Sequence, residues 1–409
     1  MYDFAKAFNR QNHNILITLL SDLGTPGWLL KLVIAFLKDR RMILRYKGCT
    51  SAEEKLPGGG PQGTKLGLYL FLILINGAGF KPKEICTQIG EALTKSKKTA
   101  IPRTQEKYVD DMAQCVALNL KRVAVPDPNQ KPALPRSYHE RTGHVLPDDA
   151  NPLQAQLDAL KEYARKHQMK INETKTKVMI FNQATSVDVH PKVKIDQDNI
   201  IEVVEQMKLL GIIIRSDMKW SSNTKNMVAK CYKRMWMLRN LKKNGADQAQ
   251  LLKIYFQQIR SVAEMACPVW NAGITLQEIS TIERVQKTAL AITLGSNYTT
   301  YNDALAILKV DTLESRRTKL CLKFALKAVR NPKFSSWFAP NTYQVNTRSV
   351  KPPFKKINCR TRRFRKSPLP YLTNLLNTHF PALKQKSDTE IQNLIMMIDE
   401  RTTPLSADD

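Results

Sequence analysis

The apolar residues of this chain follow two different patterns, and the pattern changes near Asn223. Before that point, short apolar runs alternate with glycine and proline, which predicts a mixture of helices and strands joined by turns. After it, apolar residues recur at every third or fourth position, which predicts consecutive amphipathic helices. In the first of these helices Met227, Cys231 and Met235 share one face, and Gly245 is placed to end it.

The same pattern predicts the order of the elements. We expect helices at 13–23, 26–37, from residue 66 onward, and at 152–168, 223–245, 248–265, 276–294 and 312–330. We expect strands at 41–46, at 106–118 as two strands around an acidic turn, at 177–182, and at 207–215 with a kink at Gly211. Polar, basic or proline-rich stretches at 81–105 and 122–152 predict surface insertions.

The charge of the chain narrows its partners. Lys and Arg number 64 against 36 Asp and Glu, which gives a formal net charge of +28 and a pI near 9.8. A surplus of this size indicates a polyanionic partner, with nucleic acid first among the candidates. A ribosome-associated protein or one that binds an anionic membrane could show the same balance, so charge alone fixes only the sign of the partner.

Cysteine spacing and hydropathy predict the compartment. The seven cysteines include no pair at C-x-x-C spacing, which argues against zinc knuckles and a disulfide framework. The longest apolar run, 66–75, is about half the length of a membrane helix, and the N-terminus has no signal-peptide pattern. We therefore expect an intracellular protein, nuclear and cytoplasmic, with no membrane partner.

An acidic pair between strand-forming residues is the first candidate for chemistry. Of three adjacent aspartate pairs, only Asp110-Asp111 is framed by residues typical of strands, Tyr108-Val109 before it and 112–116 after it. Two carboxylates between apolar strands are costly unless a cation neutralises them. A metal site and a plain acidic turn both remain open on this basis.

A resemblance to a known family bears on that choice. Tyr108-Val109-Asp110-Asp111 resembles the Tyr-x-Asp-Asp box of reverse transcriptases. Four other segments resemble motifs of the same family, in the family's order, and the resemblance covers about residues 2–330. These segments are Asp3-Phe4-Ala5-Lys6-Ala7-Phe8-Asn9 with His13 and Leu16, Gly60-Pro61-Gln62-Gly63-Thr64 with Leu66-Gly67, Asn172-Glu173-Thr174-Lys175-Thr176, and Leu209-Leu210-Gly211. Stretches 276–295 and 301–317 are similar to the post-palm region of jockey- and CR1-like non-LTR elements.

The resemblance implies a fold and its parts. It implies an α+β right-hand polymerase: a palm with an antiparallel sheet and helices on one face, then a helical thumb. The palm would span 1–218, the thumb and post-palm region 219–332, and a basic, proline-containing tail 333–409. The fingers and any endonuclease would precede Met1, so we expect an N-terminally truncated chain with little activity alone, because Asp3 would lie on a frayed strand end.

The resemblance also assigns roles to residues. Asp3, Asp110 and Asp111 would be catalytic and, with the backbone carbonyl of Phe4, would bind two Mg²⁺ ions, with Mn²⁺ as a substitute. Lys175 would stabilise the departing pyrophosphate. The partners implied are an RNA template, a DNA primer and dNTPs. Nucleotide contacts would come from Phe8, Pro61, Gln62 and Gly63, and Leu209, Leu210 and Gly211 would form the primer grip.

Each of these roles has a plainer alternative. Without the other motifs, Phe8 would be a core residue, because it shares helical spacing with Ala5. Gln62 would be a loop residue, and Lys175 one of many surface lysines. The glycine-rich segment 58–65 misses the phosphate-binding P-loop pattern, because its Thr64 precedes the lysine instead of following it.

The basic tail supports a rival function. Residues 351–366 carry many basic residues, two interleaved phenylalanines and no acid, a composition that suits phosphates and exposed bases. A catalytically dead or host-adopted relic could use this segment only to bind nucleic acid, and the segment could equally be a nuclear localisation signal or a solvated tail. Its expected contacts are Lys355, Lys356, Arg360, Arg362, Arg363, Arg365 and Lys366.

Overall fold

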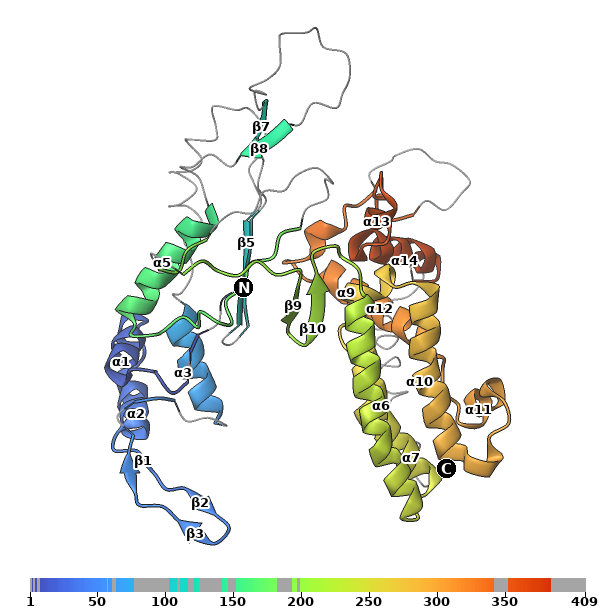
Figure 1. Cartoon of the computed structure of the whole chain (residues 1–409), viewed down its shortest axis with the longest axis horizontal. Coiled ribbons are helices and arrows are strands. Elements are labelled where there is room, and N and C mark those ends of the chain that lie inside the picture. The colour runs from blue at the N-terminus through green and yellow to red at the C-terminus, as the bar shows by residue number, and fades with distance from the viewer. Residues whose placement is uncertain are drawn as a thin grey trace, which may run out of the picture. The chain divides into compact units, whose positions relative to one another are not determined.

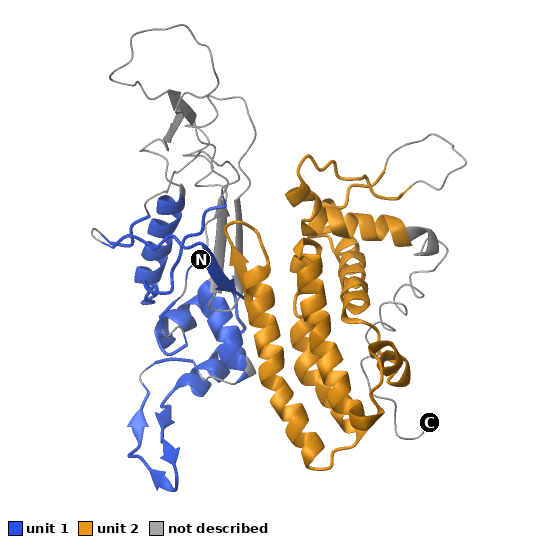
Figure 2. Cartoon of the chain, turned by 45° about the vertical axis from the view of Figure 1, so that its right-hand side comes forward, with its two compact units in different colours: residues 1–210 blue, residues 211–409 orange. Residues whose placement is uncertain are grey.

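The computed structural model of the protein forms two compact units, each with its own apolar core. It describes residues 2, 4–5, 8–56, 58–60, 64–76, 103–108, 111–116, 121–124, 142–145, 152–181, 193–196, 199–341 and 352–383. Unit 1 is Met1–Leu210 and unit 2 is Gly211–Asp409 (Figure 2). The chain passes from one unit to the other at residue 210, whereas the palm was expected to end at residue 218.

In the part of unit 1 that the structure describes, four helices enclose one apolar core (Figure 1). The side chain of Asn12 starts the first helix by accepting hydrogen bonds from the backbone N–H groups of Asn14 and Ile15. This helix contacts the next two, and their facing apolar residues, such as Leu16 and Phe71, are fully buried. The four are α1 (His13–Asp22), α2 (Gly27–Leu37), α3 (Lys65–Asn76) and α5 (Pro152–Lys166).

A narrow ribbon follows α2 where the sequence predicted one continuous strand at 41–46. Strand β1 (Arg41–Met42) pairs with β4 (Glu54–Lys55), and β2 (Arg45–Tyr46) pairs with β3 (Cys49–Thr50). All eight strand residues are exposed, so no buried face holds a longer strand. The ribbon turns at Lys47 and Gly48, whose φ angles of 47° and 82° are typical of the two-residue hairpin turn.

Two further hairpins belong to unit 1. Strands β5 (Arg103–Tyr108) and β6 (Asp111–Val116) pair antiparallel, as the pattern around the acidic pair predicted. Strands β7 (Lys121–Ala124) and β8 (Thr142–Val145) pair within the stretch that was predicted to be a surface insertion. The expected strand at 177–182 is represented, over its described residues, by one bridge from Val178 to Val203. Every sheet among the described residues has two strands, so the palm sheet stays a prediction.

Unit 2 is helical, as the spacing of its apolar residues predicted. Helix α6 lies against α10, and α12 packs on α10 (Figure 1). Capping boxes at Asp247 and Thr275 fix where two of the helices begin. The helical segments of this unit include α6 (Ser221–Lys243), α7 (Gln248–Ile254), η1 (Tyr255–Arg260), α8 (Ser261–Glu264), α10 (Leu276–Leu294) and α12 (Leu313–Arg330).

The helix predicted at 248–265 contains a π-helical segment, η1, that the sequence did not indicate. Tyr255, Ile259 and Arg260 of this segment are all buried. A polar ring and a guanidinium thus enter the core from one short segment. Tyr255 and Ile259 continue the four-residue spacing of the buried Leu251 and Ala263, so Arg260 is the polar group whose burial helical periodicity does not indicate.

The predicted C-terminal tail is in part an integral piece of unit 2. Helices α13 (Arg362–Arg365) and α14 (Pro368–Leu383) follow residue 352, and α14 packs against α12 and the short helix α9 (Cys267–Trp270). Leu372 and Leu376 of α14 are buried in the core of the unit. The proline and basic content of this stretch predicted only a tail, but the prolines at 368 and 370 lie in the first turn of α14, where proline is tolerated. The short helix α11 (Tyr301–Ile307) was also not predicted.

Candidate functional site

The first motif segment is tied into unit 1 beside a distant part of the chain. Phe4 forms an antiparallel bridge with Ile171, and the backbone N–H of Ala5 donates to the carbonyl of Lys170 at 2.8 Å. Tyr2 and Phe4 are both buried, and burial, followed by the charge of Asp158, raises the pKa of Tyr2 to about 12. The residues that flank Asp3 are therefore packed and paired, and the argument from a frayed end does not apply to them.

The lysine-containing motif begins where that bridge ends. The carbonyl of Asn172 accepts hydrogen bonds from the backbone N–H and the hydroxyl of Thr176, at 2.9 and 2.7 Å. Its side-chain oxygen also accepts from the backbone N–H of Lys175 at 3.3 Å. The resulting turn leaves the Lys175 side chain exposed. Because Ile171 pairs with Phe4, the first motif and the lysine motif are neighbours in space although their sequence positions are far apart.

The glycine-rich motif also lies against the first motif. The backbone N–H of Gly60 donates to the carbonyl of Phe8 at 2.7 Å, and that of Gly59 donates to the carbonyl of Gln11 at 2.8 Å. A ring nitrogen of His13 lies 2.9 Å from the Gly59 carbonyl. A Cβ on Gly60 would lie 2.4 Å from the Gln11 side-chain oxygen, so this approach requires glycine.

The phenylalanine expected at the steric gate is packed against helix α3. The ring of Phe8 stacks on the ring of Phe71, with centroids 4.5 Å apart and planes 29° apart. Phe8 is half-buried, so one part of the ring contacts the core and another part stays accessible. This arrangement suits the core interpretation of Phe8 and leaves the gate as a prediction.

The structure describes the two strands of the acidic hairpin but not Val109 and Asp110 between them. Tyr108 and Asp111 face each other as the last pair of the β5–β6 ladder. Asp3, Asp110 and the segment Pro61-Gln62-Gly63 lie outside the described residues, as does the side chain of Asp111. Within the residues that are described, no group of three or more His, Cys, Asp or Glu side chains could hold a metal ion. The two-metal site therefore stays a prediction.

The expected primer-grip segment forms a tight hairpin turn. It joins β9 (Gln206–Leu209) to β10 (Ile212–Arg215), and both turn residues, Leu210 and Gly211, have positive φ angles of 48° and 88°. A leucine at such an angle is strained, and the side chain of Leu210 is nevertheless half exposed. A Cβ on Gly211 would lie 2.7 Å from the end of the Met265 side chain, so the turn is closely packed.

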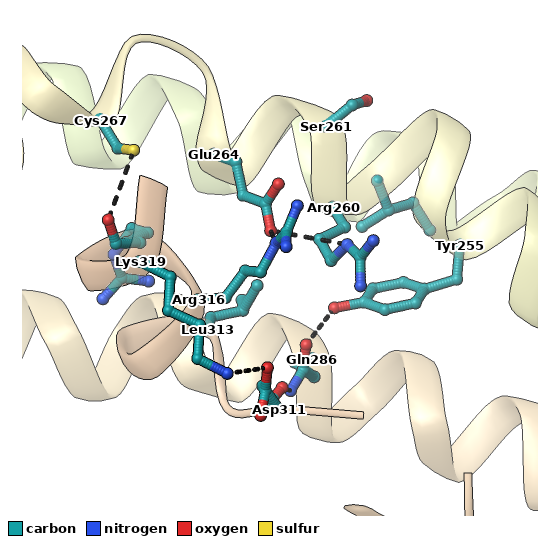
Figure 3. A network of polar contacts seen from close by, with 12 residues as sticks. Tyr255, Arg260, Ser261, Glu264, Cys267, Gln286, Asp311, Leu313, Arg316 and Lys319 are labelled. Atoms are coloured by element: carbon teal, nitrogen blue, oxygen red, sulfur yellow. Dashed lines mark hydrogen bonds and ion pairs between the residues drawn. The ribbon is translucent and has the colours of Figure 1, made fainter. Parts of the chain in front are cut away.

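A buried polar network in unit 2 was missed by the sequence analysis (Figure 3). One carboxylate oxygen of Glu264 accepts from Arg316 at 3.1 Å and faces Arg260 at 3.5 Å. Both arginines are almost fully buried, and burial lowers the pKa of Arg260. Beside them the hydroxyl of Tyr255 donates to the side chain of Gln286. The network joins the π-helical segment to α10 and α12, and helical spacing alone gave no signal for it.

A second carboxylate of the same unit holds the start of helix α12. Glu283, on α10, accepts hydrogen bonds from the backbone N–H groups of Leu313 and Glu314, at 3.0 and 3.3 Å. It also accepts a hydrogen bond from the hydroxyl of Tyr301. Burial, together with this hydrogen bond, raises the pKa of Tyr301. Three helices are therefore fixed relative to one another by one side chain, which gives unit 2 a rigid frame.

Among the helices that the structure describes, none is long and apolar enough to cross a membrane.

The basic residues expected to bind nucleic acid all lie on the surface of unit 2. The basic side chains follow one another over residues 355–366, in the segment that leads into α13 and α14. All seven are exposed: Lys355, Lys356, Arg360, Arg362, Arg363, Arg365 and Lys366.

Comparison with known proteins supports a reverse-transcriptase-like relation for the chain. No protein-family profile matches it. A probable RNA-directed DNA polymerase from transposon BS of Drosophila melanogaster is 24% identical over 279 residues, which cover 68% of this chain and 26% of that protein. The chain therefore spans about a quarter of the length of this relative. It is distantly related to a transposon RNA-directed DNA polymerase.

Proposed function

We propose that the chain contains the palm and thumb of an RNA-directed DNA polymerase from a non-LTR retrotransposon of the jockey or CR1 type. It would extend a DNA primer on an RNA template. The observation that supports this best is the convergence in unit 1 of the segments around Phe4, Phe8, Gly60 and Asn172. Phe4 and Phe8 belong to the first motif, and Gly60 and Asn172 belong to two motifs far from it in sequence. The family uses all three motifs at its catalytic centre.

In this proposal the reaction is carried by carboxylates at the edge of two strands. Asp3, Asp110 and Asp111, with the carbonyl of Phe4, would hold two Mg²⁺ ions. The ions, when bound, lower the pKa of the primer 3′-hydroxyl and stabilise the leaving pyrophosphate. The β5–β6 hairpin suits this role, because the residues of its last described pair, Tyr108 and Asp111, are separated in sequence by two residues, one of which is Asp110.

Other residues of the chain would orient the substrates. The ring of Phe8, held against Phe71, would exclude a ribose 2′-hydroxyl and so select dNTPs. Gln62 would contact the incoming nucleotide between Pro61 and Gly63. Lys175, exposed on its turn, would stabilise charge on the departing pyrophosphate.

The hairpin turn at the start of unit 2 would act on the primer. Leu209, Leu210 and Gly211 form a closely packed turn with an exposed apolar side chain at its tip. Such a tip can pack against the sugar or base at a primer end without forming a hydrogen bond of its own. Positive φ angles are ordinary at both positions of a two-residue hairpin turn, so the exposed apolar tip, and not the φ angle of Leu210, supports this role.

Primer extension by paired variants tests the proposal. Asp110→Asn should abolish Mg²⁺- or Mn²⁺-dependent extension of a primed RNA template and leave template–primer affinity nearly unchanged, because affinity comes mostly from phosphate contacts. Asp148→Asn is the matched control, since it alters another adjacent aspartate pair that lacks flanking strand residues. Extension by Asp110→Asn at more than a few per cent of the parent rate would contradict the assignment.

A nucleic-acid-binding relic is the second candidate, and the exposed basic segment at 355–366 favours it. That surface would bind RNA or DNA whether or not the carboxylates work. The two candidates differ in one measurement, made on residues 1–409 and on a protein extended upstream of Met1. Extension of a primed template that depends on Asp110, in either protein, supports the polymerase, and binding without extension by both proteins, in Mg²⁺ or Mn²⁺, supports the relic.

A further inference from the structure

The basic C-terminal segment is anchored to unit 2 rather than loosely attached. Phe354 bridges to Pro340, and its ring meets the ring of Phe338 edge-on at 6.0 Å. The side chain of Asn377, on α14, accepts from the backbone N–H of Phe354 at 3.1 Å and donates to its carbonyl at 3.0 Å. The chain therefore leaves residue 354 from a fixed point, so the residues that follow have a defined surface position.

The short helix α13 presents one aromatic ring to solvent. The hydroxyl of Thr361 accepts from the backbone N–H of Phe364 at 3.1 Å, and the hydroxyl of Ser367 donates to the Phe364 carbonyl at 2.7 Å. The backbone of Phe364 is thus held on both sides. Its side chain is nevertheless 44% exposed. The backbone of Phe364 is therefore fixed, while much of the apolar surface of its ring is in contact with solvent.

That ring lines an open pocket of about 450 Å³ with three polar neighbours, Asn358, Arg360 and Thr361. An asparagine amide offers a donor and an acceptor, which is what the edge of a nucleobase requires. An arginine offers a planar fork of donors for a base edge or a phosphate. A flat aromatic ring beside these groups suits a flat ligand that carries hydrogen-bonding groups on its rim.

The charge around the pocket has one sign. Residues 352–383 contain no Asp or Glu. None of the basic side chains over 355–366 forms an ion pair with any residue that the structure describes. Unpaired cations around an exposed ring are the arrangement found where proteins track the backbone of a single strand and stack its bases. Arg363 and Arg365 flank the ring in sequence and are themselves exposed.

We propose that this pocket binds an unpaired base of single-stranded nucleic acid, with the base stacked on Phe364. Asn358 would contact the base edge, and the surrounding arginines would contact the phosphates on either side. A duplex has its bases stacked inside, so it could use the charges but not the ring. The proposal rests on the proposed function in taking nucleic acid as the partner, and it requires no catalysis at Asp110.

Equilibrium binding by the full chain tests the ring and the charges separately. The probes are a labelled 12-nucleotide dT strand, oligo-U of the same length, a dT strand with abasic sites, and a 12-base-pair duplex. Phe364→Leu keeps an apolar side chain without the ring, and it should weaken binding to dT and oligo-U about 5- to 150-fold. It should leave duplex binding and the salt dependence unchanged. Phe364→Trp should restore the single-strand affinity.

Arg363→Gln is the matched control, because it removes a neighbouring exposed charge but no ring. It should weaken single strands and duplex alike and reduce the single-strand log–log salt slope by about 0.7. The abasic strand should bind wild type and Phe364→Leu equally. Equal losses on single strand and duplex for Phe364→Leu, or no loss on either, would overturn the proposal. No loss on any probe from either variant would instead make the segment a targeting signal or an acidic-protein contact. Because the readout is binding, inactive Asp110→Asn protein should give the same result.

Discussion

Replacing Glu264 by Gln should destabilise unit 2 by about 3–5 kcal/mol, because it neutralises the carboxylate that two buried guanidinium groups face. Arg316 and Arg260 both face the same carboxylate oxygen, at 3.1 and 3.5 Å. Unit charges about 4 Å apart attract by about 4 kcal/mol at an effective dielectric of 20. Both attractions are lost when the carboxylate becomes a neutral amide. A neutral amide costs less desolvation free energy to bury than a carboxylate, and this difference offsets only part of the loss.

Urea unfolding of the full chain measures the change. Urea carries no charge, so it does not screen the ion pairs as guanidinium chloride would. The transition of unit 2 can be followed by tryptophan fluorescence, because four of the five tryptophans lie in this unit and one of them, Trp270, is fully buried. Asp311→Asn is the control: its pair with Lys319 at 2.6 Å is more than one-third exposed on both sides, and its loss should cost less than about 1 kcal/mol.

A double-mutant cycle shows whether the cost comes from the lost attraction between Glu264 and Arg316. Arg316→Met removes one of the two guanidinium groups and keeps most of its apolar volume. Combined with Glu264→Gln, it should cost clearly less than the sum of the two single changes, by about 2 kcal/mol. Additive costs, or a cost below about 1 kcal/mol for Glu264→Gln alone, would refute the reasoning.

Four further outcomes are expected. Phe8→Val should lower the dNTP-to-rNTP ratio of efficiencies in primer extension, and an unchanged ratio would make Phe8 a core residue only. Lys175→Leu should slow turnover with little change in nucleotide affinity, which single-turnover kinetics can separate. Gln11→Leu should stabilise unit 1 by about 1–2 kcal/mol in urea, because both amide atoms of this buried side chain lack partners among the described residues. Asp217→Asn should cost about 1 kcal/mol at pH 7, after allowing for solvent screening; hydrogen bonds from Arg215 lower the pKa of Asp217 to about 2, so this cost should fade as the pH drops from about 4 to about 2.

The helices of unit 2 could be predicted from sequence because their signals are local. Apolar spacing predicted a helix at 312–330, and the structure has α12 at Leu313–Arg330, capped by Thr312. The spacing also predicted a helix at 276–294, and the structure has α10 at Leu276–Leu294, capped by Thr275. Periodicity and capping act within a few residues, so they survive in any tertiary context.

Features that depend on distant residues could not be predicted in this way. The π-helical segment and the buried arginines form because Tyr255, Arg260 and Arg316 meet partners on other helices. Nothing in the sequence near Arg260 and Arg316 distinguishes these two arginines from surface residues. Helix α14 was not predicted, because the proline and basic content of the stretch indicated a tail and its apolar face is explained only by α12 and α9.

For the candidate site, too, part of the arrangement could be predicted from the sequence and part could not. Motif order alone indicated that the segments around Asp3, Gly60 and Lys175 belong together, and the backbone bonds of Phe4 and Phe8 bring their described parts into contact. The pocket around Phe364 could not be foreseen, because it needs the fixed position that Asn377 gives to the chain before it. Composition indicated the charge of that segment and left its shape unknown.

The docking of α14 has a consequence for how the protein is made. Unit 2 closes only when Leu372 and Leu376 reach a core whose other helices end with α12 at Arg330. A contact such as the hydrogen bond from Asn271 to Tyr371 joins residues 100 positions apart. At about 5–20 residues per second, a ribosome needs about 2–8 s to add the roughly forty residues between α12 and that part of α14. During those seconds the nascent chain carries a finished set of helices with an open apolar seam, which makes this the interval in which a chaperone or an early folding error has most influence.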